Sequence, residues 1–162
     1  MLFYGETQHK PLVIRDANVW RGKERGFVQE DLLFENGKVV ESLQGEADQF
    51  DAGGKWVIPG LIDAHFHAYA YSQDGIEIER GALSLIALNG SQRLGAALRR
   101  GFTTVRDVAG GDIGLGLAIQ KSLLSSPRYL FTGPALSQTG GHGDPRLPHI
   151  DLCLSHLSLI HI

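Results

Sequence analysis

Two histidines and one carboxylate occur at every second position of an apolar segment, and these residue types can bind a metal ion. In the stretch GLIDAHFH they are Asp63, His65 and His67. Side chains alternate between the two faces of a β-strand, so we expect these three on one face and Ile62 and Phe66 on the other. Because neutral imidazole is a common zinc ligand, His65 and His67 are candidate metal ligands. Asp63 is expected to orient a ligand imidazole or to approach the metal itself.

Polar side chains on a buried strand need partners. A parallel strand is normally covered on both faces, and each polar group buried there without a partner would cost ~1 to 3 kcal/mol. A metal ion would satisfy His65 and His67, and the alternative is a pair of hydrogen-bonded histidines without metal. The position of the pair favours the metal, because (β/α) barrels build their sites at the carboxyl ends of the strands.

The elements that must position this pair change in kind near Pro59. Residues 1–58 contain short apolar β segments separated by polar turns, and Asn36-Gly37 is a two-residue hairpin signal, so a small β module is predicted. After Pro59 the pattern alternates between strands and helices, which predicts a parallel sheet with right-handed crossovers. The expected order is a strand at 61–67, a helix at about 79–100, a strand at 102–107, a helix at about 113–124 and a strand at 128–136 interrupted at Gly133-Pro134.

Residue types also predict two helix ends and a third candidate site residue. Gly101 follows Arg99-Arg100, which is typical of a helix that ends on a left-handed glycine. Asp112, after Gly110-Gly111, is the expected N-cap of the next helix. Asp107 ends the strand 102–107 and is a candidate for contacting a substrate, with an ion pair to Arg106 or a capping role as the more favoured alternative.

Composition excludes several classes of partner. Apolar residues make up 43% of the 162 residues, which is enough for a core. The net charge is −3 and no basic run is present, so nucleic acid is not an expected partner. No apolar run approaches the ~20 residues that cross a bilayer, so no membrane partner is expected. The N-terminus lacks a secretory signal pattern and Cys153 is the only cysteine, interpreted as structural, so a cytoplasmic location is expected.

Three motifs together resemble the amidohydrolase superfamily, in its imidazolonepropionase-like and Xaa-Pro-dipeptidase-like branch. They are VIPGLIDAHFH, GFTTVRDVAGG and GPALSQTGGHGD, and the resemblance runs from about Leu12 to Pro145. It implies an α/β fold, namely the N-terminal part of a (β/α)8 TIM barrel preceded by a small β-sandwich module. Residues 1–58 would form the β-sandwich module and residues 59–150 the first βα units of the barrel.

The resemblance also implies a chemistry. His65 and His67 match the metal ligands of the first barrel strand, in an enzyme with one or two divalent metals. Zinc is favoured by the ligand type, although manganese, cobalt or iron would accept the same ligands. A metal-activated water would hydrolyse a C–N bond in an amide, a lactam or an Xaa-Pro dipeptide, so the expected partner is a small-molecule or dipeptide substrate. His142 matches a histidine near the third strand and is a candidate substrate contact, with a solvent-exposed loop histidine as the alternative. Whether the parent enzyme is a homo-oligomer stays open.

The sequence departs from the family in length. A complete barrel needs ~250 residues, whereas the part after Pro59 allows roughly three βα units. The family's bridging lysine, later histidines and late aspartate have no match here, so we expect this chain to be an inactive N-terminal fragment of a metal-dependent hydrolase. Residues 151–162 fit neither the family nor the βα spacing, and their end, LSLIHI, resembles translated adapter sequence. For the function of the whole chain, the alternatives to a hydrolase fragment are a non-catalytic metal-binding or interaction domain and a regulatory pseudoenzyme fragment.

Overall fold

The computed structural model describes residues 2–3, 10–138, 140–144 and 158–161. The chain folds into two compact units that divide between Pro59 and Gly60, with Leu2 and Phe3 belonging to the second unit. No helix in these described ranges is long and apolar enough to cross a membrane. Cys153 and most of the segment 151–162 lie outside the described residues, so the sequence predictions for them remain predictions.

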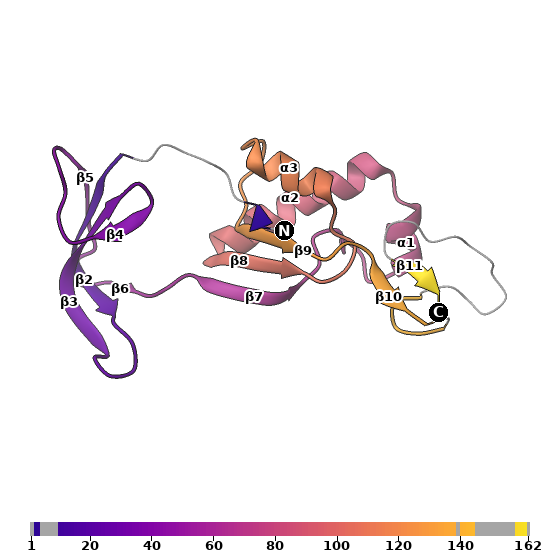
Figure 1. Cartoon of the computed structure of the whole chain (residues 1–162), viewed down its shortest axis with the longest axis horizontal. Coiled ribbons are helices and arrows are strands. Elements are labelled where there is room, and N and C mark those ends of the chain that lie inside the picture. The colour runs from indigo at the N-terminus through magenta and orange to yellow at the C-terminus, as the bar shows by residue number, and fades with distance from the viewer. Residues whose placement is uncertain (1, 4–9, 139, 145–157, 162) are drawn as a thin grey trace. The chain divides into compact units, whose positions relative to one another are not determined.

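The first unit is a small β sheet (Figure 1). The order of its main strands is β4-β3-β2-β5, and β6 pairs with the far end of β2. Its small core consists of Ala17, Val19, Leu32 and Ala52. The strands are β2 (Leu12–Trp20), β3 (Phe27–Glu35), β4 (Lys38–Val40), β5 (Asp48–Asp51) and β6 (Trp56–Val57).

The hairpin between β3 and β4 is confirmed. Glu35 pairs with Lys38, so Asn36 and Gly37 form a two-residue loop. Both have positive φ angles, 51° and 73°, as a type I′ turn requires. Asn and Gly are the residues that adopt this conformation at least cost, which is why the dipeptide predicts the turn.

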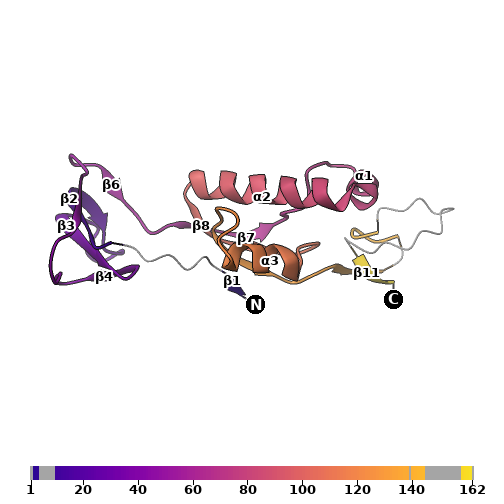
Figure 2. The ribbon, with the colours of Figure 1, turned by 90° about the horizontal axis from the view of Figure 1, so that it is seen from above.

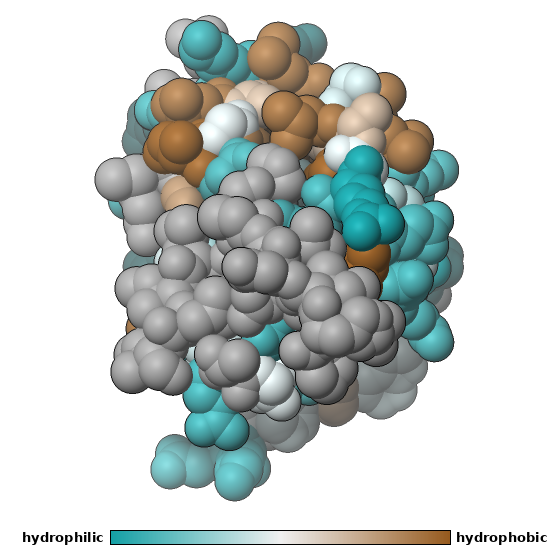
Figure 3. All heavy atoms as spheres, turned by 90° about the vertical axis from the view of Figure 1, so that its right-hand side faces the viewer, coloured by the Kyte–Doolittle hydropathy of each residue, from teal (hydrophilic) through white to brown (hydrophobic). Residues whose placement is uncertain are grey.

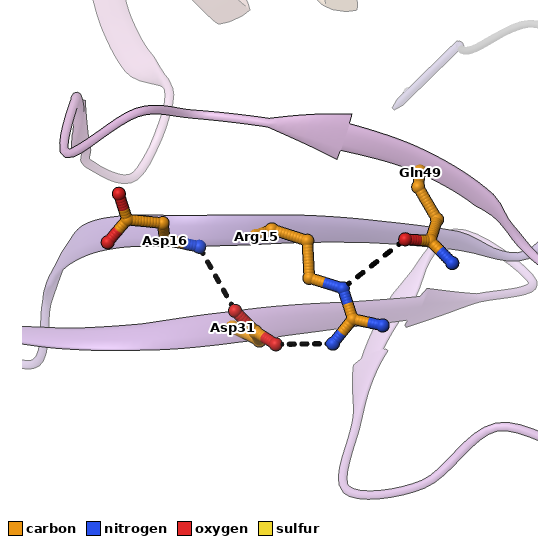
Figure 4. A network of polar contacts seen from close by, with 4 residues as sticks. All are labelled: Arg15, Asp16, Asp31 and Gln49. Carbon is orange, nitrogen blue, oxygen red and sulfur yellow. Dashed lines mark hydrogen bonds and ion pairs between the residues drawn. The ribbon is translucent and has the colours of Figure 1, made fainter.

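A β-bulge in β2 is held by a network of polar contacts (Figure 4). The register with β3 shifts between Ile14 and Ala17, and Asp16 has a φ of 49°. The carboxylate of Asp31 accepts the backbone N–H of Asp16 at 3.0 Å and pairs with Arg15 at 2.6 Å. Arg15 also donates to Gln49 on β5 at 3.5 Å, so one exposed side chain connects three strands of the sheet.

The second unit contains three parallel strands, β7 (Leu61–Phe66), β8 (Phe102–Asp107) and β9 (Arg128–Phe131). A short strand β1 (Leu2–Phe3) pairs antiparallel with β9, which gives the order β1-β9-β8-β7. β10 (Ala135–Ser137) pairs in parallel with β11 (Ser158–His161). The mixed α/β class predicted from the sequence is confirmed.

The helices differ from the prediction at their ends. The expected helix at 79–100 is two helices, α1 (Gly75–Arg80) and α2 (Leu83–Arg99), because Gly81 between them is extended. The helix α3 (Ile113–Gln120) begins where predicted, with Asp112 as its N-cap accepting the N–H of Leu115 at 2.9 Å, but it ends earlier than expected. The left-handed glycine after α2 is confirmed, since Gly101 has a φ of 92°.

The core of the second unit lies between the sheet and two helices. α2 and α3 lie side by side over the same face of the sheet (Figures 1 and 2). Leu94 of α2, Ile119 of α3, and Val105 and Tyr129 of the strands are at most 1% exposed and form the centre of this core. Each helix therefore buries one face against the strands that carry the site.

The expectation that β7 is a buried strand is wrong in this structure. β7 is an edge strand that pairs with β8, and Ile62 is 70% exposed. α2 and α3 lie over one face of the sheet, and every residue of β7 is exposed or half-buried. Exposed apolar residues also occur on the helices, for example Leu88, and Figure 3 shows apolar side chains gathered over the helix side of this unit.

Candidate metal centre

His65 and His67 lie at the carboxyl end of β7 with their rings facing one another. The Nε2 atoms of the two rings are 3.2 Å apart, and the ring planes meet at 74°. Nδ1 of His67 lies 3.3 Å from the carbonyl oxygen of Ala109, in the segment that follows β8. The carboxyl ends of two neighbouring parallel strands thus meet at this histidine pair, as they do in α/β proteins generally.

The hydrogen bond to Ala109 determines the tautomer of His67. A carbonyl oxygen can only accept, so this bond requires the proton on Nδ1 of His67, and in the neutral imidazole the lone pair is then on Nε2. A ligand imidazole in a metalloprotein commonly donates its second ring N–H to a carbonyl or a carboxylate in the same way. The free lone pair of His67 points at Nε2 of His65.

The spacing of the two nitrogens fits a single metal ion. Two nitrogens 3.2 Å apart, each at the ~2.0 to 2.1 Å typical of zinc–imidazole bonds, subtend ~100° at the ion, close to a tetrahedral angle. Both rings could therefore reach one ion with little movement. Within the described residues, however, no group of three or more His, Cys, Asp or Glu side chains is arranged to hold a metal. The pair by itself offers two possible ligands, fewer than the three protein ligands that a catalytic zinc commonly has.

Asp63 does not contact either ring. Its carboxylate accepts the backbone N–H of His65 at 3.0 Å and lines a hollow of about 370 Å³ with Phe66 and Arg93. The strict alternation predicted for this strand is interrupted, because the register with β8 shifts between Asp63 and Phe66. The carboxylate of Asp63 therefore contacts the main chain of His65, and its expected role toward the imidazoles or the metal stays a prediction.

Asp107 is buried rather than exposed to a substrate. Its side chain is 0% exposed, and it accepts bonds from the N–H of Ala68 at 3.0 Å, the hydroxyl of Tyr129 at 2.9 Å and the N–H of Ala109 at 3.3 Å. Burial raises the pKa of Asp107, and the three hydrogen bonds offset only part of that rise. The carboxylate is enclosed by protein donors in this structure, and a substrate contact by Asp107 stays a prediction.

The two favoured alternatives for Asp107, an ion pair and a capping role, have different outcomes. The ion pair with Arg106 is wrong, because Arg106 donates instead to the carbonyl oxygen of Ala64 at 2.8 Å. The capping role is close to what is seen, since the carboxylate accepts an N–H two residues further along the chain.

His142 does not contact the histidine pair. It is exposed in a turn after β10, where the N–H of Gly143 donates to Ser137 at 3.1 Å and Gly140 donates to Asp144 at 2.9 Å. Among the described residues, no hydrogen bond or ring contact joins it to His65 or His67. The alternative of an exposed loop histidine describes it in this structure, and a substrate contact remains a prediction.

Three residues that the sequence did not indicate support the pair. The Nε atom of Arg93 donates to the carbonyl oxygen of His67 at 3.3 Å, and its guanidinium lies 5.9 Å from the ring centroid of Phe66. Ala109 acts through its carbonyl oxygen and Tyr129 through its hydroxyl, whose pKa burial raises far above the usual range. Ala109 carries no sequence signal, because any residue provides the same carbonyl.

Comparison with known proteins places the described site in a family. The amidohydrolase family model matches residues 56–158, which include β7, β8 and β9. Ochratoxinase from Aspergillus niger is 34% identical over 92 residues, covering 54% of this chain and 19% of that enzyme. Adenine deaminase from Lactiplantibacillus plantarum is 35% identical over 65 residues, covering 38% of this chain and 12% of that enzyme. The chain thus spans a fifth or less of these relatives.

Solved structures agree with the family match. A prolidase crystallised with N-methylphosphonate-L-proline superposes with a TM-score of 0.79 at 36% identity, covering 88% of this chain and 36% of that chain. A Xaa-Pro dipeptidase with bound methionine superposes with a TM-score of 0.66 at 26% identity, covering 83% and 36% of the two chains. With the family model matched over more than half of its residues, this chain belongs to the amidohydrolase family.

Proposed function

We propose that this chain forms the first part of a metal-dependent amidohydrolase that hydrolyses a carbonyl–nitrogen bond, and that His65 and His67 supply two of its metal ligands. The observation that carries the proposal is the 3.2 Å separation of their Nε2 atoms at the end of the first parallel strand. When bound, a divalent ion of the zinc type polarises a carbonyl and acidifies water. The proposed architecture is the start of a (β/α)8 barrel preceded by a β-sandwich module, with residues 1–58 and 59–150 as the two parts.

The chain's own residues would prepare the site in two ways. The carbonyl of Ala109 holds the proton of His67 on Nδ1, so Nε2 is already free to bind a metal. The bond from Arg93 to the carbonyl of His67 fixes the main chain beside the ring. Both contacts restrict the imidazole before any metal arrives, which lowers the ordering cost of binding.

The substrate class that we favour is an Xaa-Pro dipeptide. The prolidase match covers 88% of this chain at 36% identity, and the dipeptidase match supports the same class. A lactam or another amide is the second candidate, because the ochratoxinase and adenine deaminase matches show that family members differ in substrate.

The chain alone should not be a hydrolase. A catalytic zinc commonly has three protein ligands, and the described residues offer the histidine pair. We therefore expect weak zinc binding and no turnover by the 162-residue chain, and activity in a protein that adds the missing ligands. A non-catalytic metal-binding domain would instead bind zinc stoichiometrically without the remainder of a barrel.

Two experiments test these proposals. Zinc is titrated calorimetrically into the metal-free chain and into the variants His65→Ala, His67→Ala and His142→Ala. Loss of binding in the first two variants and its retention in the third supports the ligand assignment, whereas unchanged binding in all three contradicts it. For catalysis, residues 1–137 replace the corresponding part of the prolidase relative. Acyl-proline hydrolysis by this chimera, reduced at least ~100-fold by His67→Ala, supports the substrate class.

A further inference from the structure

Asp107 is a fully buried carboxylate for which the proposed hydrolysis has no direct use. It stands at the end of β8, and its three side-chain hydrogen bonds come from protein groups. A buried acidic side chain without a chemical role would be replaceable by a neutral one. Its bonds, however, reach the peptide that follows His67 and the N–H of Ala109, whose carbonyl contacts the ring of His67.

The first connection runs through the peptide that joins His67 and Ala68. The N–H of this peptide donates to Oδ2 of Asp107 at 3.0 Å, and its carbonyl accepts from Nε of Arg93 at 3.3 Å. The peptide is therefore held at both ends. Its orientation sets the backbone from which the imidazole of His67 projects.

The second connection runs through Ala109. Oδ1 of Asp107 accepts the N–H of Ala109 at 3.3 Å, while the carbonyl of the same residue accepts Nδ1–H of His67 at 3.3 Å. One carboxylate thus holds both the peptide that follows His67 and the residue whose carbonyl accepts the hydrogen bond of its ring. We propose that Asp107 is a positioning residue that holds His67 in the Nδ1–H tautomer with Nε2 free. Only the use of that tautomer to bind a metal rests on the proposed function.

The space around the carboxylate fits this role. A Cβ atom at Gly111 would lie 2.6 Å from Oδ2 of Asp107 and 2.0 Å from the hydroxyl of Tyr129, so a residue with a side chain would displace one or both groups. The side chain of Asp107 is 0% exposed, and bulk water does not reach it to replace a lost acceptor. The two main-chain bonds therefore depend on both carboxylate oxygens.

The test compares Asp107→Asn with Tyr129→Phe in the metal-free 162-residue chain. An amide has one acceptor oxygen, so Asp107→Asn deprives either Ala68 or Ala109 of its acceptor. Tyr129→Phe removes a bond from the same carboxylate but leaves both main-chain bonds. Long-range ¹H–¹⁵N correlation spectra at about pH 8 report the tautomer of each neutral histidine. We expect the Nδ1–H pattern of His67 in the wild type and in Tyr129→Phe, and its loss in Asp107→Asn.

Two results would overturn the proposal. Retention of the Nδ1–H pattern in Asp107→Asn would show that the carboxylate does not position the ring, and loss in both variants would show that general loosening of the core moves it. If Asp107→Asn does not fold, wild-type hydrogen exchange decides. The amides of Ala68 and Ala109 should then exchange at least ~100-fold more slowly than in an unfolded peptide, and fast exchange of either contradicts the proposal. These measurements use no metal, so a failure of zinc binding leaves them interpretable.

Discussion

Nε2 of His65 lies 3.2 Å from Nε2 of His67, and the two rings are not equivalent. His67 donates its Nδ1 proton to Ala109, so the hydrogen between the two Nε2 atoms belongs to His65. An imidazole that binds a metal through Nε2 needs a lone pair on that atom. His67 is therefore already in the ligand tautomer, whereas His65 must move its proton to Nδ1 before it can bind.

The first prediction follows from this asymmetry. Zinc added to the chain should change the tautomer of His65 from Nε2–H to Nδ1–H and leave that of His67 unchanged. Long-range ¹H–¹⁵N correlation spectra check this result, with the exposed His142 as an internal control. A tautomer change at His67, or none at His65 when zinc is bound, would contradict the assignment.

The second prediction concerns pH. Burial raises the pKa of Asp107 above its value in the unfolded chain, outweighing the bonds from Ala68, Tyr129 and Ala109. Between the two pKa values the folded chain binds more protons, so the stability from this group is complete below the unfolded pKa and is lost as pH rises through the folded pKa. The free energy of unfolding of the wild type relative to Asp107→Asn should therefore fall as pH rises from about 4. Urea denaturation over a pH series measures it, and a constant or rising difference would refute the prediction.

The third prediction concerns the hydroxyl of Tyr129. It is buried, and its pKa is raised far enough that it donates to Asp107 throughout the neutral range. Tyr129→Phe keeps the ring in the core, where it lies 5.7 Å from the ring of Phe131, but removes this bond. We expect a loss of about 1 to 2 kcal/mol in the free energy of unfolding, measured with denaturant at pH 7. An unchanged stability would show that the hydrogen bond makes no net contribution.

The sequence predicted what depends on local chemistry. The Asn36-Gly37 hairpin, the Asp112 N-cap and the left-handed Gly101 follow from the conformations that these residues adopt most readily. The strand at 102–107 was also predicted with its observed ends. In each case the interactions that decide the conformation lie within a few residues of one another.

The sequence did not predict what depends on contacts across the sheet. The register shift after Asp63 arises from pairing with β8, so alternation along the strand could not predict it. The carboxylate of Asp107 accepts the backbone N–H groups of Ala68 and Ala109, and the sequence does not indicate these bonds because every residue except proline has such a group. His65 and His67 were identified from their alternation on an apolar strand, their position at its carboxyl end and the resemblance of the surrounding motif, but their hydrogen bonds were not.

The last prediction tests the packing that supports the site. Leu94 of α2 is 0% exposed and packs against the strands that end at the histidine pair, whereas Leu88 of the same helix is 70% exposed. Leu94→Ala removes buried methyl groups and leaves a cavity, so we expect a loss of about 2 to 5 kcal/mol in the free energy of unfolding. Leu88→Ala makes the same chemical change at the surface and should alter it by less than about 0.5 kcal/mol. Equal losses in the two variants would show that Leu88 is covered in solution, by another copy of the chain or by a segment outside the described residues.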